Sequence, residues 1–339
     1  MNEGFFMATK NKLVIVGMGH VGSAVLNHAI GFQLVSEIAV VDIDEKKAYG
    51  EALDASHSTP STYSQNIKVY SGGYEECRDA RVIIIAAGFA GRSLPPLKPG
   101  EIRDRLRLAG RNIKVIHDVM TEITKYTKEA VIIMISNPLD ITTYYAANFF
   151  DYPLDRLLGT GTTLETLRFQ RILADHYNID AKNVNGLMLG EHGKSAFVAW
   201  SLTNVSGIPI EQFDEYFYPK EPLDRDGAAE AVIRAASDIV DNKGWTNYGI
   251  AMGACRIAKA VLFNERSILP VCTTLQGEYG ISNVALSLPC LVTENGVERR
   301  LAIPLKQEEV IKLKQSAATL TATLEQHHIL KGEALLKAQ

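Results

Sequence analysis

The chain has 339 residues, of which 46% are hydrophobic and 22% charged. This composition is typical of soluble globular proteins, and at roughly 150 residues per domain the length predicts two domains. The formal net charge of −4 leaves no excess of Lys and Arg to neutralise a phosphate backbone, so nucleic acid is not an expected partner. No apolar run approaches the roughly 18 residues of a membrane helix, so we expect no membrane segment.

Short β-branched runs alternate with longer amphipathic stretches in the first half of the chain. This alternation is typical of parallel strands joined by crossover helices. The predicted strands cover residues 12–16, 37–42, 81–86 and 130–135, and the predicted helices begin after Gly22 and cover 102–128 and 141–150. The pattern predicts an α/β domain with a doubly wound parallel sheet over residues 8–160.

The second half of the chain loses this alternation. Helical spacing is found over 163–177, 228–241 and 247–263, and strands over 284–293 and 298–305 are predicted to form a hairpin through Asn295-Gly296. A last helix is expected around Val310, Leu313, Ala317, Leu320 and Leu324, which recur at steps of three and four residues. We predict a second, α+β domain over residues 161–339.

The four cysteines are far apart in the sequence and lie in apolar surroundings. They are Cys77, Cys255, Cys272 and Cys290, and none forms a C-x-x-C pair. This pattern predicts buried free thiols rather than disulfides or a metal site. We therefore expect no metal ion and a cytoplasmic location.

A glycine motif follows the first predicted strand and opens the first predicted helix. It consists of Gly17, Gly19 and Gly22, with His20 and Val21 before the last glycine. Such glycines allow a tight turn and close approach of a pyrophosphate, and the helix N-terminus offers free N–H groups to the anion.

An acid stands at the spacing that this motif requires. Asp42 lies twenty residues after Gly22, at the end of the second predicted strand. A carboxylate there accepts ribose hydroxyls and repels a 2′-phosphate, which favours NAD over NADP. The alternative is an ordinary strand-to-helix turn followed by an exposed acid.

Three polar positions are candidates for chemistry. His192 lies between glycines after an apolar run, Arg168 follows Glu165 by three residues on a predicted helix, and Arg103 begins a helix after a loop rich in glycine and proline. Each has a structural alternative: a hydrogen-bonded histidine, an i, i+3 ion pair and a solvated arginine. No single position decides between the two interpretations.

Taken together, the motifs resemble the L-lactate and L-malate dehydrogenase family over nearly the whole chain. Residues 158–164 and 189–200 look most like L-2-hydroxyisocaproate dehydrogenases and related L-lactate dehydrogenases. The resemblance implies a Rossmann NAD-binding domain followed by the family's C-terminal substrate-binding and catalytic domain. The matching segments are Ile135-Ser136-Asn137-Pro138, Gly159-Thr160-Gly161, Gly190-Glu191-His192-Gly193, Gly244-Trp245-Thr246 and Glu278-Tyr279-Gly280.

The resemblance implies reversible hydride transfer between NADH and C2 of a 2-oxo acid. In this reading His192 exchanges a proton with the carbonyl oxygen, and Arg168 holds the substrate carboxylate bidentately. Arg103, carried by a closing loop, polarises the carbonyl. Glu165 stands where the family carries an aspartate paired with the histidine, and it retains the carboxylate.

Further site residues also come from the resemblance. Asn137 is expected to orient the substrate or His192, and Thr246 to line the pocket. The residues expected to bind the cofactor are Gly17, Gly19, His20, Val21, Gly22, Asp42, Ala87, Gly88, Asn137 and Ile250.

The loop before Arg103 departs from the family pattern. It is about six residues longer than in common lactate enzymes, and Leu97 stands where these carry Gln and malate enzymes carry Arg. An apolar side chain does not compensate a buried carboxylate, so we expect a 2-oxo acid with an apolar side chain. Arg92 or Lys98 reaching inward is the alternative.

Three other functions remain open. They are an L-malate dehydrogenase, a catalytically silent NAD-binding redox sensor, and an NAD-dependent glycosidase, which would also need a metal. The redox sensor would not require His192, Arg168 and Arg103 together. The resemblance further implies a homodimer or homotetramer.

Overall fold

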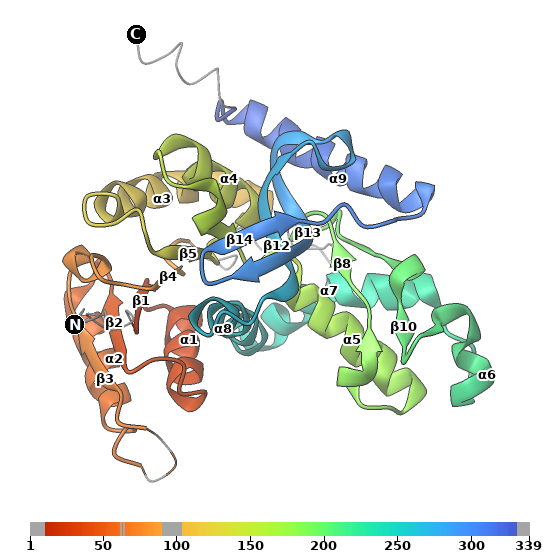
Figure 1. The fold of residues 1–339 in the computed structure, drawn as a ribbon, viewed down its shortest axis with the longest axis horizontal. Helices are drawn as coiled ribbons and strands as arrows, with labels where there is room; N and C mark the ends of the chain where they lie inside the picture. Colours follow the sequence, from red (N-terminus) through yellow and green to blue (C-terminus); the bar gives the residue numbers. More distant parts are fainter. Residues whose placement is uncertain (1–10, 62, 64, 90–103, 331–339) are drawn as a thin grey trace, which may run out of the picture.

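A mixed β-sheet runs through the centre of the molecule (Figure 1). The computed structural model describes residues 11–61, 63, 65–89 and 104–330. Strands β3-β2-β1-β4-β5-β6 lie side by side and parallel, and the antiparallel strands β12, β13 and β14 extend the sheet beyond β6. Their bounds are β1 Lys12–Val16, β2 Glu37–Val41, β3 Lys68–Ser71, β4 Val82–Ile85, β5 Val131–Met134, β6 Leu157–Gly159, β12 Ser267–Gln276, β13 Ser282–Thr293 and β14 Gly296–Arg300.

Each parallel strand contributes alternate side chains to two separate cores. In β1, Val14 and Val16 face a core shared with helices α3 (Ala109–Ile123) and α4 (Leu139–Phe149). Leu13 and Ile15 face the other core, shared with α1 (His20–Gly31) and α8 (Tyr248–Leu262). Because both faces of the sheet are covered by helices, the strand sequences are almost continuously apolar. The prediction of a doubly wound α/β fold is confirmed.

The remaining elements form a smaller core on one side of the sheet. Helix α5 (Thr163–Tyr177) packs there against α7 (Arg225–Lys243) and the short α6 (Phe213–Phe217). The short strands of this region are β7 Val184–Asn185, β8 Met188–Leu189, β9 Phe197–Val198, β10 Asn204–Val205 and β11 Ile208–Pro209. The last helix, α9 (Gln307–Gln326), returns to pack on the main body through Leu313, Leu320 and Leu324, as its spacing predicts.

Several elements were not predicted from the sequence. Strand β3 is a short, mostly half-exposed edge strand, β6 has three residues, and β12 carries Pro270 within it. Helix α2 (Glu45–Ser56) is the crossover between β2 and β3, and only Ala48 and Ala52 of it are buried. These elements lack the long apolar pattern that marks strands and helices in a sequence.

The terminal hairpin differs from the prediction by one residue at its turn. Glu294 and Asn295 form the turn, and Gly296 opens β14 with a φ of +94°. An added Cβ at Gly296 would lie 2.0 Å from the carbonyl oxygen of Asp155, so the glycine is needed for close approach as well. Strand β14 ends at Arg300, five residues before the predicted end.

The helix predicted over 102–128 is interrupted. Its described part begins as a 3₁₀ helix, η3 (Arg105–Leu108), and continues as α3, which ends at Ile123. The other 3₁₀ helices in the described part of the chain are η1 Tyr74–Cys77, η4 Leu154–Arg156, η5 Ala181–Asn183, η6 Trp200–Leu202, η7 Ile210–Gln212 and η8 Glu278–Gly280.

All four cysteines are buried and free, as predicted. Burial raises the pKa of the Cys77 and Cys255 thiols to about 12, so both stay protonated at neutral pH. Within the described ranges no helix is both long and apolar enough to cross a membrane.

The glycine motif brings α1 unusually close to the preceding turn. Gly17 has a φ of +97°, and a Cβ added at Gly22 would lie 1.9 Å from the Gly17 carbonyl oxygen. The third glycine is therefore required for close packing of the helix on the turn, the task that its spacing predicts. At Gly31, in the last turn of the same helix, an added Cβ would meet nothing within 4 Å.

These two glycines give a matched test of the packing. We expect Gly22→Ala to lower the melting temperature, because backbone must move to admit the methyl group. Gly31→Ala should leave the melting temperature unchanged or raise it, since alanine is favoured over glycine in a helix by about 1 kcal/mol. Thermal unfolding followed by circular dichroism measures both, and equal melting temperatures would contradict the packing argument.

Candidate active site

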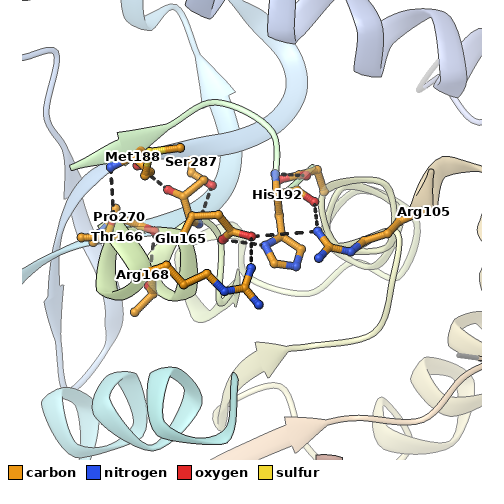
Figure 2. Close-up of polar contacts among 11 residues, drawn as sticks. Arg105, Glu165, Thr166, Arg168, Met188, His192, Pro270 and Ser287 are labelled. Atoms are coloured by element: carbon orange, nitrogen blue, oxygen red, sulfur yellow. Dashed lines mark hydrogen bonds and ion pairs between the residues drawn. The ribbon is translucent and has the colours of Figure 1, made fainter. Parts of the chain in front are cut away.

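Polar side chains from three distant segments meet around the carboxylate of Glu165 (Figure 2). Glu165 and Arg168 come from the first turns of α5, and His192 comes from the segment that follows β8. Arg105 reaches the group from η3, and Figure 2 shows it on the far side of the imidazole from Arg168. The i, i+3 spacing of Glu165 and Arg168 puts both on one face of the helix.

His192 and Glu165 form a buried pair. The imidazole Nδ1 lies 2.9 Å from Glu165 Oε2, and the two residues are 6% and 3% exposed. The longer side chain of glutamate thus still reaches the ring. Because its Nδ1 faces the carboxylate, the imidazole is fixed in orientation and its other nitrogen, Nε2, is left for a ligand.

Two guanidinium groups face the other carboxylate oxygen. Arg168 Nη1 lies 3.8 Å and Arg105 Nη1 3.9 Å from Glu165 Oε1. Both separations are too long for hydrogen bonds, so the ion pairs do not consume the N–H donors of either group. Arg105 Nη1 also donates a hydrogen bond of 2.9 Å to the carbonyl oxygen of His192.

Burial and charge act in opposite directions on the pair. Burial by itself would raise the pKa of Glu165, but the His192 imidazole and the two guanidinium groups lower it to about 2. Burial lowers the pKa of His192, and the Glu165 carboxylate opposes this. Glu165 is therefore ionised at neutral pH, and its charge favours the protonated imidazole.

The backbone of His192 is held by a buried acid that sequence reasoning missed. The His192 N–H donates to Asp140 Oδ2 over 2.8 Å, and Asp140 is only 2% exposed. Burial, reinforced by the charge of Glu191, raises the pKa of Asp140 to about 7. Its place directly after Pro138-Leu139, behind β5, was the available signal.

The neighbouring Glu191 fixes the same segment from the other side. Its carboxylate accepts hydrogen bonds from the backbone N–H and hydroxyl of Ser195, and its own N–H donates to Ser316 on α9. Gly190, with a φ of +90°, exchanges backbone hydrogen bonds with Ser287 of β13. The histidine is thus anchored to the sheet and to the last helix.

The glycine loop and Asp42 meet at the carboxyl end of β1 and β2. Asp42 Oδ2 accepts a 2.6 Å hydrogen bond from the Met18 N–H, and Oδ1 accepts one of 3.0 Å from Asp44. Gly19 caps α1 without any side-chain hydrogen bond, so no side chain competes for the N–H groups at the helix start. His20, the first residue of α1, stacks on Trp245.

Asn112 holds together the segments that follow β4 and β5, and it was not predicted as a site residue from the sequence. This fully buried side chain accepts from the Phe89 N–H and donates to the carbonyl oxygens of Phe89 and Asn137. Gly88, with a φ of +150°, lies against it, and Ser136 donates to the carbonyl oxygen of Ala87. The Oδ1 atom of Asn137 is buried without a hydrogen-bond partner.

These features fit a bound dinucleotide. A Cβ at Gly22 has no room, the start of α1 is uncapped, Asp42 is placed for ribose hydroxyls, and the buried Asn137 Oδ1 awaits a donor. No group of three His, Cys, Asp or Glu side chains suited to a metal ion occurs among the residues that the structure describes.

A cavity of about 380 Å³ opens beside Arg168. Thr246 and Ile250, both expected site residues, line it together with α5 and α7. The other lining residues are Leu164, Leu167, Arg171, Ile172, Ala235, Ile239, Lys243, Asn247, Tyr248 and Gly249. Cationic side chains beside mainly apolar walls suit a small carboxylic acid.

Two expected site residues, Arg103 and Leu97, lie outside the described residues. The arginine that the structure describes next to His192 is Arg105, two positions after Arg103. Four arginines occur between positions 103 and 111, and this clustering was a signal that either of the first two reaches the site.

The two halves of the chain match two family models. Residues 11–159 match the NAD-binding domain of lactate/malate dehydrogenases, and residues 162–330 match the α/β C-terminal domain of the same enzymes. The cofactor predicted from the glycine loop and Asp42 is thereby confirmed.

Relatives that are similar over nearly the whole chain support the same family. L-lactate dehydrogenase 2 of Clostridium acetobutylicum is 50% identical over 93% of this chain and 97% of its own length, and the L-lactate dehydrogenase of Selenomonas ruminantium is 49% identical over 94% and 98%. The minor L-lactate dehydrogenase of Enterococcus mundtii has a similar structure, with a TM-score of 0.85, 37% identity and coverage of 94% of this chain and 98% of its own. The chain therefore belongs to the lactate/malate dehydrogenase family and is an NAD-dependent oxidoreductase of that family.

Proposed function

We propose that the protein interconverts a 2-oxo acid and the corresponding L-2-hydroxy acid, with NADH or NAD as the hydride carrier. The observation that carries the proposal is the convergence of His192, Arg168 and Arg105 on Glu165, with Arg168 also lining the cavity. The lactate dehydrogenases among its relatives support this reaction class.

We assign the proton transfer to His192. With Glu165 ionised, the Nδ1–H group keeps its proton and donates a hydrogen bond to the carboxylate. Nε2 therefore gives a proton to the carbonyl oxygen or removes one from the hydroxyl. Glu165 stabilises the imidazolium and holds the ring in one orientation. The hydrogen bond from His192 N–H to Asp140 keeps the residue in place during both directions of the reaction.

Arg168 is the proposed carboxylate clamp. Its guanidinium lines the cavity and makes no hydrogen bond with Glu165, so two parallel N–H donors remain for a carboxylate. Asn137 and Thr246 are proposed to orient the substrate, and the cofactor residues keep the assignments that the family resemblance implies.

A guanidinium beside the carbonyl would stabilise the negative charge that develops there. The sequence assigned this task to Arg103, while Arg105 is the arginine with a described position near His192. We favour Arg105 for this role and keep Arg103 as the alternative.

The substrate is proposed to carry an apolar side chain. Leu164, Leu167, Ile172, Ile239 and Ile250 line the cavity, and Leu97 is the residue expected in the specificity loop. Of the two further cations that line the cavity, Arg171 pairs with Asp175, and Lys243 donates a hydrogen bond to the neutral amide of Asn247 and lies over the Tyr248 ring. A second substrate carboxylate would have to compete with these contacts for a cation, which disfavours the malate alternative.

A silent redox sensor would not need this arrangement. A buried His–Glu pair with two guanidinium groups is costly to assemble unless a ligand uses it, because each buried charge must be desolvated. The convergence therefore favours the enzyme over the sensor.

We further propose a homodimer or homotetramer in the cytoplasm. Large apolar side chains stay exposed on α2 (Tyr49, Leu53), α5 (Leu167) and α8 (Tyr248, Met252), which favours a subunit contact. The four free thiols fit a reducing compartment. The molar mass of the purified chain in solution tests the assembly.

Replacing Glu165 by Gln tests the proton-transfer pair. We expect kcat for reduction to fall by about 10²- to 10⁴-fold with little change in the Kd for NADH. Because the carboxylate favours imidazolium, its loss lowers the His192 pKa further. Reduction requires imidazolium, so its decline with rising pH should begin at a lower pH than in the wild type. Stopped-flow pH profiles measure this.

Asp175→Asn is the control for this experiment, since it removes an exposed carboxylate from the same helix. Its pH profile should match the wild type. A Glu165→Gln profile that also matches would refute the pairing.

The arginines can be separated by three variants. Arg105→Gln should lower kcat by about 10²- to 10³-fold, as for loss of one donor to a developing oxyanion. Arg103→Gln should lower kcat by a smaller factor. Arg107→Gln, at an exposed position of η3, should leave kcat as in the wild type. Steady-state rates with saturating NADH give the ranking. If Arg103→Gln lowers kcat more than Arg105→Gln does, Arg103 and not Arg105 stabilises the developing charge.

A substrate panel tests the side-chain preference. We expect kcat/KM for pyruvate and 2-oxoisocaproate to exceed that for oxaloacetate, because the second carboxylate would be buried without a cation. NADH absorbance follows all three reactions. Preference for oxaloacetate would support the malate alternative.

A further inference from the structure

An aromatic stack joins the cofactor loop to the substrate side of the molecule. The imidazole of His20 lies on the indole of Trp245 with ring centroids 3.9 Å apart and an interplanar angle of 5°. His20 is the first residue of α1, whereas Trp245 belongs to the turn between α7 and α8. The stack therefore links two segments from different halves of the chain.

The turn that carries Trp245 forms one wall of the cavity. Lys243, Thr246, Asn247 and Tyr248 all line it, and Trp245 lies between them in sequence and stacks on His20. The turn starts at Gly244, which ends α7 with a φ of +92°. The residues that follow such a glycine are no longer held by the hydrogen bonds of the helix, so other contacts must fix their position.

Some of those contacts lie within the turn. Lys243 Nζ donates a 2.7 Å hydrogen bond to Asn247 and lies 4.1 Å from the centre of the Tyr248 ring. Both contacts stay within residues 243–248, so they shape the turn without attaching it to the sheet. Trp245 attaches the turn to the start of α1, whose position is fixed by the close packing of Gly22 on Gly17.

We propose that His20 is a positioning residue for the substrate wall: by stacking on Trp245 it holds the turn that presents Thr246 to the cavity. The inference rests on the proposed function, because it concerns the binding of the 2-oxo acid. A residue of the glycine loop thereby acts on substrate affinity through Trp245.

This role predicts a change in substrate binding, whereas the place of His20 in the glycine loop suggests a change in cofactor binding. A glycine-loop side chain that served only the dinucleotide would change the Kd for NADH when removed. The part of the cofactor site that His20 offers is its backbone N–H at the start of α1, and His20→Ala keeps that N–H. Loss of the stack frees the turn, so the KM for the 2-oxo acid should rise while the Kd for NADH stays nearly constant.

A double-mutant cycle tests the inference. His20→Ala and Trp245→Ala should each raise the KM for the preferred 2-oxo acid between about twofold and tenfold, the range for a lost ring pair. The double variant should be no worse than the worse single variant, because the residues act as one unit. His20→Phe, which keeps a flat ring, should restore most of the wild-type KM.

The same helix provides a matched control. His28, in the last turn of α1, also contacts an aromatic ring: its centroid lies 5.6 Å from that of Phe32. His28→Ala should leave the KM for the 2-oxo acid unchanged. The Kd for NADH and the melting temperature of each variant are measured alongside, so that loss of the cofactor or of the fold is recognised.

The outcomes separate the inference from the function on which it rests. Additive effects of His20→Ala and Trp245→Ala, or an increase confined to the Kd for NADH, would overturn the positioning role while the reaction stands. A wild-type protein that reduces no 2-oxo acid would overturn both.

Discussion

The site depends on one ionised carboxylate that is almost completely buried. Glu165 is 3% exposed, and without partners its charge would be too costly to keep in such a place. His192, Arg168 and Arg105 make the charge tolerable, and the carboxylate in turn holds the imidazole in one orientation. Removing any one of these partners leaves the others poorly compensated, so the group acts as a unit.

The continuous sheet explains how segments distant in sequence meet at this carboxylate. Strand β6 ends the parallel part and pairs with β12, so the chain around α5 and the antiparallel strands stands on the same framework as the glycine loop. Ser287 of β13 and Ser316 of α9 then fix the segment around His192. The ligand side lies at the carboxyl ends of the parallel strands, where doubly wound sheets bind their ligands.

The two ligands are served by neighbouring parts of one surface. Asp42 and the uncapped start of α1 belong to the proposed dinucleotide site, and the turn around Thr246 lines the cavity. Trp245 and His20 lie where these parts touch. We therefore expect a substitution in one part to act on the ligand of the other.

The sequence by itself determined the sheet type, the family and the cofactor, because these depend on local patterns: apolar strands, glycines at fixed spacing and an acid twenty residues on. It also named His192, Glu165 and Arg168, which the structure brings together. Only the tertiary structure decided that Asp140, Asn112, Arg105 and Trp245 belong to the same region. Their contacts join segments far apart in the chain, and no spacing within a single segment reports such contacts.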